Sequence, residues 1–185
     1  METTLSLHPP LRACWTKRGE QPLVPAPGTQ QTHHIFAAYN WADDTVTWTM
    51  SDKKNSQAFI AFLEHLFIDQ FPTGRRVLVL DNAPYHTSGE SLAALSLFEH
   101  RVLIFWLPKY CSLELNPIER FWRHFKDTIC VNKLFPSLED LIKAAQLQMN
   151  RQNDPKYSDR FIRACYALLS LGVLGSRHDK NRLSK

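Results

Sequence analysis

The sequence predicts a single α/β domain built on a mixed β-sheet with helices on both faces. Two apolar runs, at 75–81 and 101–108, are continuous rather than alternating, which favours parallel strands covered on both sides. The segment between them and several segments around them repeat apolar residues at helical spacing. A chain of 185 residues with 44% hydrophobic residues is long enough for one domain with a core.

The first half of the chain begins with irregular structure and continues with a hairpin and a helix. Residues 1–32 are rich in Pro, Gln and Thr, which excludes long helices there. The β-prone runs 33–40 and 45–50 flank a polar turn at 41–44, which predicts a hairpin. Asn55 then offers an N-cap for an amphipathic helix over 57–71. We expect its apolar face to be Phe59, Phe62, Leu63, Leu66 and Phe67.

The second half alternates strands and helices and then becomes helical. After the strand at 75–81 we expect a helix at 88–100, the strand at 101–108, and helices at 116–132 and 137–153. The last of these begins with a capping box, Ser137 to Asp140. A weaker helical segment at 158–172 precedes a basic tail. We expect one main domain over 1–155, followed by a C-terminal helix and basic tail over 156–185.

Composition indicates a cytoplasmic protein. No apolar run approaches the ~20 residues of a membrane span, and the N-terminus lacks a secretory signal. The four cysteines are scattered without metal-ligand spacing, which favours reduced thiols. Much of the net charge of +4 lies in the last nine residues, so charge alone leaves open a solvated tail or a nucleic-acid arm.

Asp81 ends an apolar strand in the stretch VLVLDNAPYH. The carboxyl ends of parallel strands form the ligand-binding edge of α/β sheets. Pro84 disfavours helical geometry at Ala83, so the chain leaves Asp81 in an extended or turn conformation. A purely structural interpretation is that Asp81 hydrogen-bonds its own turn.

Glu119 is the second acidic candidate. Asn116, Pro117 and Glu119 form a capping box, which by itself explains this sequence without any chemistry. However, the strand that ends at Pro108 should run parallel beside the strand that ends at Asp81, which brings Glu119 to the same edge. Two neighbouring carboxylates suit a hard cation such as Mg²⁺ and hence phosphoryl transfer.

Basic residues follow Glu119 at helical spacing. Arg120, Arg123 and Lys126 lie on a face distinct from the apolar one, where they are placed to contact a nucleic-acid backbone. An ordinary solvated face is the alternative.

Three stretches resemble the catalytic domain of DDE-superfamily transposases of the mariner-like insertion-sequence group. They are VLVLDNAPYH, LPKYCSLELNPIERFWRHFK and LHPPLRACWTKRGEQPLVPAPG, and the similarity covers about residues 2–155. The resemblance implies a ribonuclease H-like fold in which three carboxylates hold two Mg²⁺ or Mn²⁺ ions. It also implies DNA partners, cleavage of transposon ends, transfer of the 3′-hydroxyl to target DNA, and a homodimeric complete enzyme.

By this resemblance Asp81 corresponds to the second carboxylate and Glu119 to the third, and both are expected to be catalytic and metal-binding. Asn82 and His86 match the motif around the second, and Asn116 and Pro117 match the motif before the third. The separation of 38 residues between the acids is a few residues longer than is typical of the group, and Lys109 stands where a Pro is common.

The resemblance breaks at the N-terminus. Glu2 takes the position of the family's conserved Glu, and Met1 takes that of the first catalytic Asp. A thioether cannot replace a hard oxygen ligand, and the first strand is largely missing, which leaves unpaired sheet edges. We therefore expect this chain alone to be poorly stable and inactive. Glu2, Asp43 and Asp44 are spare acids that could replace the lost ligand, although the last two belong to a hairpin tip that should be remote.

Two functions follow from these observations. The first is a transposase catalytic-domain fragment, either truncated or completed by an upstream frame product that supplies the missing strand, Asp and helix-turn-helix region. The alternative is a non-catalytic DNA-binding or interaction remnant. A different ribonuclease H-like nuclease fits the two motifs less well.

Overall fold

The computed structural model describes residues 2–8, 10–13, 15–19, 28, 30–109 and 115–156 of the chain. The helical segment expected at 158–172, the basic tail and Met1 lie outside these residues. The elements in order are β1 Glu2–Ser6, β2 Thr32–Asn40, β3 Thr45–Ser51, α1 Ser56–Glu64, the π-helix η1 His65–Gln70, β4 Arg76–Leu80, α2 Gly89–Ser96, β5 Val102–Trp106, α4 Pro117–Ile129 and α5 Leu138–Asn153.

The predicted hairpin is confirmed as β2 and β3, which pair antiparallel from His34↔Ser51 to Asn40↔Thr45. Its turn ends at Asp44, whose φ of 58° is the left-handed conformation that Asp tolerates. β1 pairs antiparallel with the other edge of β2, from Glu2↔Phe36 to Ser6↔Thr32. These three strands form one sheet in the order β1-β2-β3.

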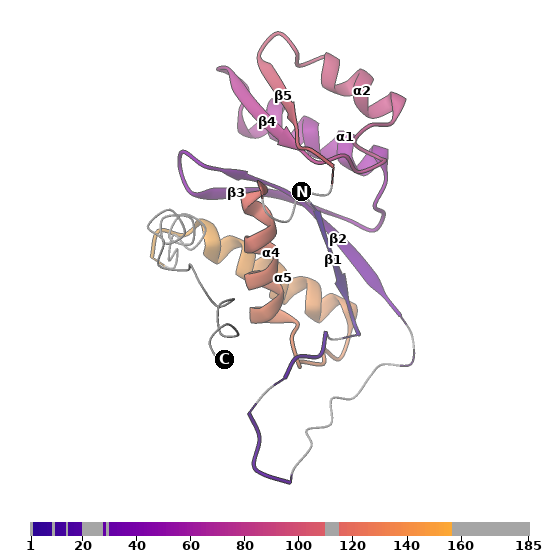
Figure 1. Cartoon of the computed structure of the whole chain (residues 1–185), viewed down its shortest axis with the longest axis vertical. Helices are drawn as coiled ribbons and strands as arrows, with labels where there is room; N and C mark the ends of the chain where they lie inside the picture. The colour runs from indigo at the N-terminus through magenta and orange to yellow at the C-terminus, as the bar shows by residue number, and fades with distance from the viewer. Residues whose placement is uncertain are drawn as a thin grey trace, which may run out of the picture.

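The two continuous apolar runs form β4 and β5, which pair in parallel as predicted. They make a second, separate sheet in Figure 1. The mixed α/β architecture is thus confirmed, but the described strands form two sheets, because the β1–β2 ladder ends at Glu2↔Phe36 and no described strand joins β2 to β4.

Helices cover the two faces of the three-stranded sheet. α4 and α5 contact its strands, and α1 contacts β2 and β3 and packs on α2 (Figure 1). Successive side chains of a strand point to opposite faces. Since Ile35, Phe36 and Ala37 are all buried, both faces of β2 are covered.

The parallel pair differs from the prediction. Leu78 and Leu80 are buried, but Val77, Leu103 and Phe105 on the alternate face are each more than half exposed. The expectation that both faces of these strands are covered is therefore wrong for the described part of the chain, where only one face is packed.

The helix boundaries follow their capping residues. Asn55 accepts a hydrogen bond from the Ala58 amide, and Ser137 accepts one from the Asp140 amide. All five apolar residues predicted for the first helix are buried. That helix, however, changes to π geometry at His65. None of the described helices has the length and apolar character needed to cross a membrane.

Candidate active site

Asp81 lies directly after β4, at the carboxyl end of the parallel pair, as predicted. Its Oδ1 accepts a hydrogen bond from the Ala83 amide at 3.2 Å, so the local-turn interpretation also holds. The next residue, Asn82, donates from Nδ2 to the Leu107 carbonyl at 2.6 Å. This bond ties the exit of β4 to the exit of β5 and fixes the edge on which Asp81 stands.

His86 holds the Asp81 carboxylate. Its Nδ1 lies 2.8 Å from Asp81 Oδ1 and 3.3 Å from the Asp81 carbonyl oxygen. Both oxygens only accept, so Nδ1 carries a hydrogen and donates it. The imidazole is fully buried and packs against the rings of Phe59 and Tyr85, with centroids 4.3 and 4.6 Å away.

The pKa of Asp81 is well below its ordinary value. Burial alone would raise it, but the hydrogen bond and charge of His86 outweigh that effect. The Asp81 carboxylate is therefore held in place and ionised at neutral pH.

Glu119 lies in the first turn of α4, as predicted. The helix begins at Asn116, whose Oδ1 accepts from the Ile118 amide at 3.3 Å, and Pro117 follows at the first helical position. The Asn116 side chain thus caps the helix through Ile118 rather than through Glu119, which differs from the expected capping box. The backbone amide of Glu119 donates a hydrogen bond to the Asn116 carbonyl at 3.1 Å.

The carboxylates of this edge interact. Burial raises the pKa of Glu119, and the negative charges of Asp81 and Glu2 raise it further. Acids from β4, α4 and β1 therefore share one electrostatic environment.

Glu2, one of the three spare acids, has a side chain that is 92% buried and lies beside Asp81 and His86. Its Oε1 is 3.0 Å from Lys54 Nζ, and its Oε2 is 3.6 Å from His86 Nε2. Nothing in the spacing of Glu2, Lys54 and His86 along the chain indicates this contact, since it depends on the pairing of β1 with β2.

Burial, with the adjoining Glu2 carboxylate, raises the pKa of Tyr85, so this phenol stays protonated. The Lys54 ammonium lies 5.5 Å from the centre of the Tyr85 ring. Glu2 is thus surrounded by Lys54, Tyr85 and His86.

The described residues do not make a complete metal site. In the described ranges no three His, Cys, Asp or Glu side chains are grouped so that they could hold an ion. The carboxylates of Asp81 and Glu119 are suitable ligands for Mg²⁺ or Mn²⁺, but these residues supply only two such side chains. In the resemblance described above, Met1 stands at the position of the first catalytic Asp. Met1 lies outside the described residues.

The three basic residues lie on α4 as predicted. Arg123 is exposed, whereas Arg120 and Lys126 are half-buried. The opposite side of the helix is buried through Ile118, Phe121, Trp122, Phe125 and Ile129.

Asp81 at the exit of a parallel strand pair and Glu119 in the first turn of α4 fit the ribonuclease H-like α/β fold expected from the sequence. Residues 2–142 match the family described as DDE superfamily endonuclease, and the chain belongs to that family. The resemblance to mariner-like insertion-sequence transposases is thereby confirmed.

Two kinds of relatives support this assignment. The chain is 28% identical over 142 residues to the insertion element IS630 uncharacterized 39 kDa protein of Shigella sonnei, covering 77% of this chain and 41% of that protein. Its fold is similar to the Mos1 transposase paired-end complex with left transposon end (TM-score 0.67, 15% identity, 92% of this chain and 52% of that one). It is also similar to the Mos1 mariner paired end complex with Mn (TM-score 0.61, 15% identity, 88% of this chain and 50% of that one). The chain spans about half the length of these proteins or less.

Proposed function

We propose that this chain supplies Asp81 and Glu119 to a divalent-metal site that cleaves DNA at transposon ends and transfers the strand. The observation that carries the proposal is the position of Asp81 directly after β4 and of Glu119 in the first turn of α4, where burial and the charges of Asp81 and Glu2 raise the pKa of Glu119. A cation between the acids would relieve this repulsion, and the family match supports that use of the site.

Each residue has a separate task in this proposal. His86 fixes the orientation of the Asp81 carboxylate and keeps it ionised. Glu119 provides the second carboxylate from α4. Together these two carboxylates would hold Mg²⁺ or Mn²⁺, two ions in the complete enzyme, which would supply activation of the attacking oxygen and stabilisation of the leaving one. Arg120, Arg123 and Lys126 contact DNA phosphates beside the site.

The 185-residue chain alone is proposed to be inactive. A third carboxylate is needed, and Glu2 is a poor substitute because Lys54 holds it at 3.0 Å beside His86. The complete enzyme, proposed to be a dimer, would obtain the missing acid from an Asp-ended strand.

Metal binding tests the site separately from activity. Mn²⁺ binding, measured by electron paramagnetic resonance, is expected to weaken at least tenfold in Asp81→Asn and in Glu119→Gln. Asp52→Asn, which changes a 92% exposed acid, serves as the matched control and should leave binding unchanged. Equal Mn²⁺ affinity in all four proteins would overturn the site.

Nicking of supercoiled DNA tests the claim of inactivity. With Mg²⁺ or Mn²⁺, the chain is expected to nick no faster than Asp81→Asn. Metal-dependent nicking by the wild-type chain that Asp81→Asn abolishes would refute this claim.

A DNA-binding role without cleavage is the second candidate, favoured by the exposed Arg123 and by the acid set, which is incomplete within the described residues. Salt-dependent DNA binding without Mn²⁺ affinity would favour it over the first proposal.

A further inference from the structure

The outer edges of β3 and β5 differ in how they are closed. At the β3 edge, Asn153 acts like a neighbouring strand: its Oδ1 accepts from the Val46 amide and its Nδ2 donates to the Val46 carbonyl, both at 2.8 Å. β5 is the outer strand of the other sheet, and among the described residues β4 is its single strand neighbour. Unpaired backbone groups at the edge of a sheet are a template for pairing with another chain.

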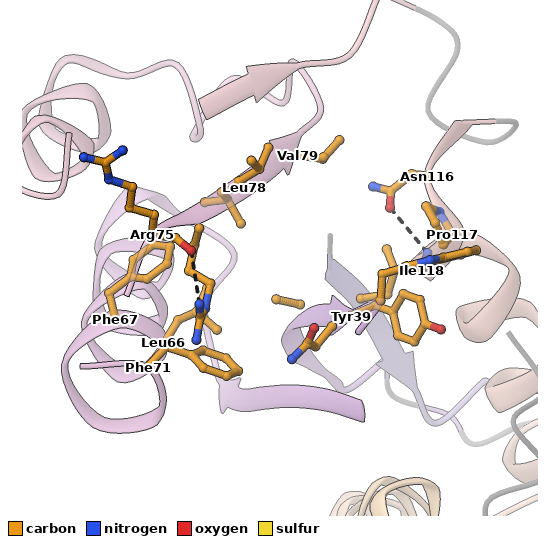
Figure 2. A pocket seen from close by; sticks show the side chains of 15 residues that line it. Tyr39, Leu66, Phe67, Phe71, Arg75, Leu78, Val79, Asn116, Pro117 and Ile118 are labelled. Atoms are coloured by element: carbon orange, nitrogen blue, oxygen red, sulfur yellow. Dashed lines mark hydrogen bonds between the residues drawn. The ribbon is translucent and has the colours of Figure 1, made fainter. Parts of the chain in front are cut away.

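The outer edge of β5 is separate from the cavity that borders β4. That cavity has a volume of about 370 Å³. Figure 2 shows Leu78 and Val79 of β4 on one side of it, with Asn116 and Ile118 across the open space. Since β5 contributes no residue to its walls, the outer edge of β5 lies on the far side of the parallel pair.

The hydrogen bonds to β4 show which backbone groups of β5 point outward. The first N–H of β4 donates to the Arg101 carbonyl at 2.9 Å, and the last carbonyl of β4 accepts from Leu107 N–H at 2.8 Å. Backbone groups of alternate residues point to opposite sides of a strand. Ile104 and Trp106 therefore direct their N–H and C=O groups away from β4, where no described residue bonds to them.

Val102, the first residue of β5, offers only its carbonyl at this edge. Its N–H already donates to the Phe98 carbonyl at 2.8 Å, in the turn that follows α2. A strand that pairs with β5 must therefore supply a donor, and not an acceptor, opposite Val102.

Apolar side chains of β5 are exposed beside the same edge. Leu103 and Phe105 are 66% and 55% exposed. They point to the same face of the sheet because they are two residues apart in the strand. A strand added at the edge would place its own side chains against both.

A second copy of β5 meets these requirements by symmetry. When two β5 strands pair antiparallel about Ile104, the Ile104 N–H of each copy bonds to the Ile104 carbonyl of the other. Trp106 N–H of each copy then meets the Val102 carbonyl of the other, so the N–H that is already used is not needed. The same register sets Leu103 of one copy opposite Phe105 of the other, which is an apolar cross-strand pair.

Charges at the two ends of β5 agree with this register. Glu99 precedes the strand and Lys109 follows it, at equal distances in sequence from Ile104. Both side chains are exposed, and neither forms an ion pair with another residue of the described ranges. Antiparallel pairing about Ile104 brings Glu99 of each copy towards Lys109 of the other, whereas parallel pairing would bring like charges together.

We propose that the outer edge of β5 pairs antiparallel with β5 of a second copy of this chain, centred on Ile104 and flanked by Glu99–Lys109 ion pairs. The two β4 strands then run in opposite directions, so the two Asp81 residues stand at opposite ends of the joined sheet. This pairing gives the dimer proposed above a defined surface. Its test needs neither metal nor DNA, so its failure would leave the proposed metal site untouched.

Analytical ultracentrifugation of the whole chain tests the pairing. A monomer–dimer equilibrium is expected between about 1 and 100 µM, because an edge-to-edge interface is small. Ile104→Pro removes an N–H that the fold itself does not use, and should weaken dimer formation about tenfold. Ile104→Ala trims the same side chain but keeps the N–H, so this control should dimerise like the wild-type chain. A monomer at all concentrations, or equal dimer formation by Ile104→Pro, would overturn the proposal.

An exchange of the flanking charges tests the register without altering the strand. Glu99→Lys and Lys109→Glu should each weaken dimer formation about fivefold, because each creates like-charge pairs at both ends of a two-fold interface. The double variant restores opposite charges and should regain the wild-type affinity. Since both residues are exposed, these variants decide the result if Ile104→Pro fails to fold. A double variant as weak as either single variant would overturn the proposal.

Amide hydrogen exchange by NMR identifies the bonded edge. Exchange at Ile104 and Trp106 should slow as the protein concentration rises, while Leu103 and Phe105 change little because their N–H groups already face β4. Protection of Ile104 and Trp106 that is independent of concentration would overturn the proposal and assign the edge to another segment of the same chain. Self-association that Phe105→Ser abolishes while the Ile104 amide stays unprotected would also overturn it, in favour of packing between the exposed faces.

Discussion

The contact between His86 and Asp81 allows the free energy of a buried hydrogen bond in the acidic cluster to be measured. The change is His86→Phe, which keeps a ring of similar size between Phe59 and Tyr85 but removes the Nδ1 donor. Because the ring contacts at 4.3 and 4.6 Å are retained, the cavity contribution is small. What is lost is a 2.8 Å hydrogen bond to a carboxylate.

A buried hydrogen bond to a charged group contributes about 1.5–3 kcal/mol, and this is the expected coupling free energy. It is measured by a double-mutant cycle of His86→Phe and Asp81→Asn, from urea unfolding at pH 7.5 followed by tryptophan fluorescence. The cycle separates this bond from the effects that each substitution has alone.

The chain contains its own control in His65 and Asp69, the same pair of residue types on the surface. His65 Nδ1 lies 3.0 Å from Asp69 Oδ2, but the two side chains are 31% and 62% exposed. The cycle of His65→Phe and Asp69→Asn should give less than about 0.5 kcal/mol. If the buried pair couples no more strongly than this surface pair, the inference that His86 controls Asp81 is wrong.

Three further predictions follow from the described contacts. Burial and the charge of Asp81 raise the pKa of Glu119 above 4.5 in the folded protein. The wild-type chain should therefore gain stability relative to Glu119→Gln as the pH falls from 7 towards 4.5. A difference in unfolding free energy that stays constant over this range would contradict the prediction. Arg123→Ala should lower the slope of log K for DNA against log salt by about 1, while Lys143→Ala on α5 should not change it. The Arg101 guanidinium donates to two carbonyl oxygens at the end of η1. The substitution Arg101→Met should therefore lower the unfolding free energy by about 1.5–3 kcal/mol, as measured by urea unfolding. An unchanged unfolding midpoint would exclude this capping role.

Local patterns predicted the elements that depend on neighbouring residues. The Asn55 and Ser137 caps, the hairpin turn at Asp44 and the buried face of the first helix are all properties of short segments. The parallel pairing of β4 with β5 also followed, because two apolar runs around a helix leave few other topologies. Asp81 and Glu119 were therefore placed at the correct ends of their elements.

The contacts between segments distant in the sequence were not predictable in the same way. Glu2 and Lys54 meet because β1 pairs with β2 in one register, and register is a property of two strands. The exposure of Val77 and Leu103 was not predicted for a related reason. A continuous apolar run indicates a strand, but it does not determine which other segments pack on each face of that strand.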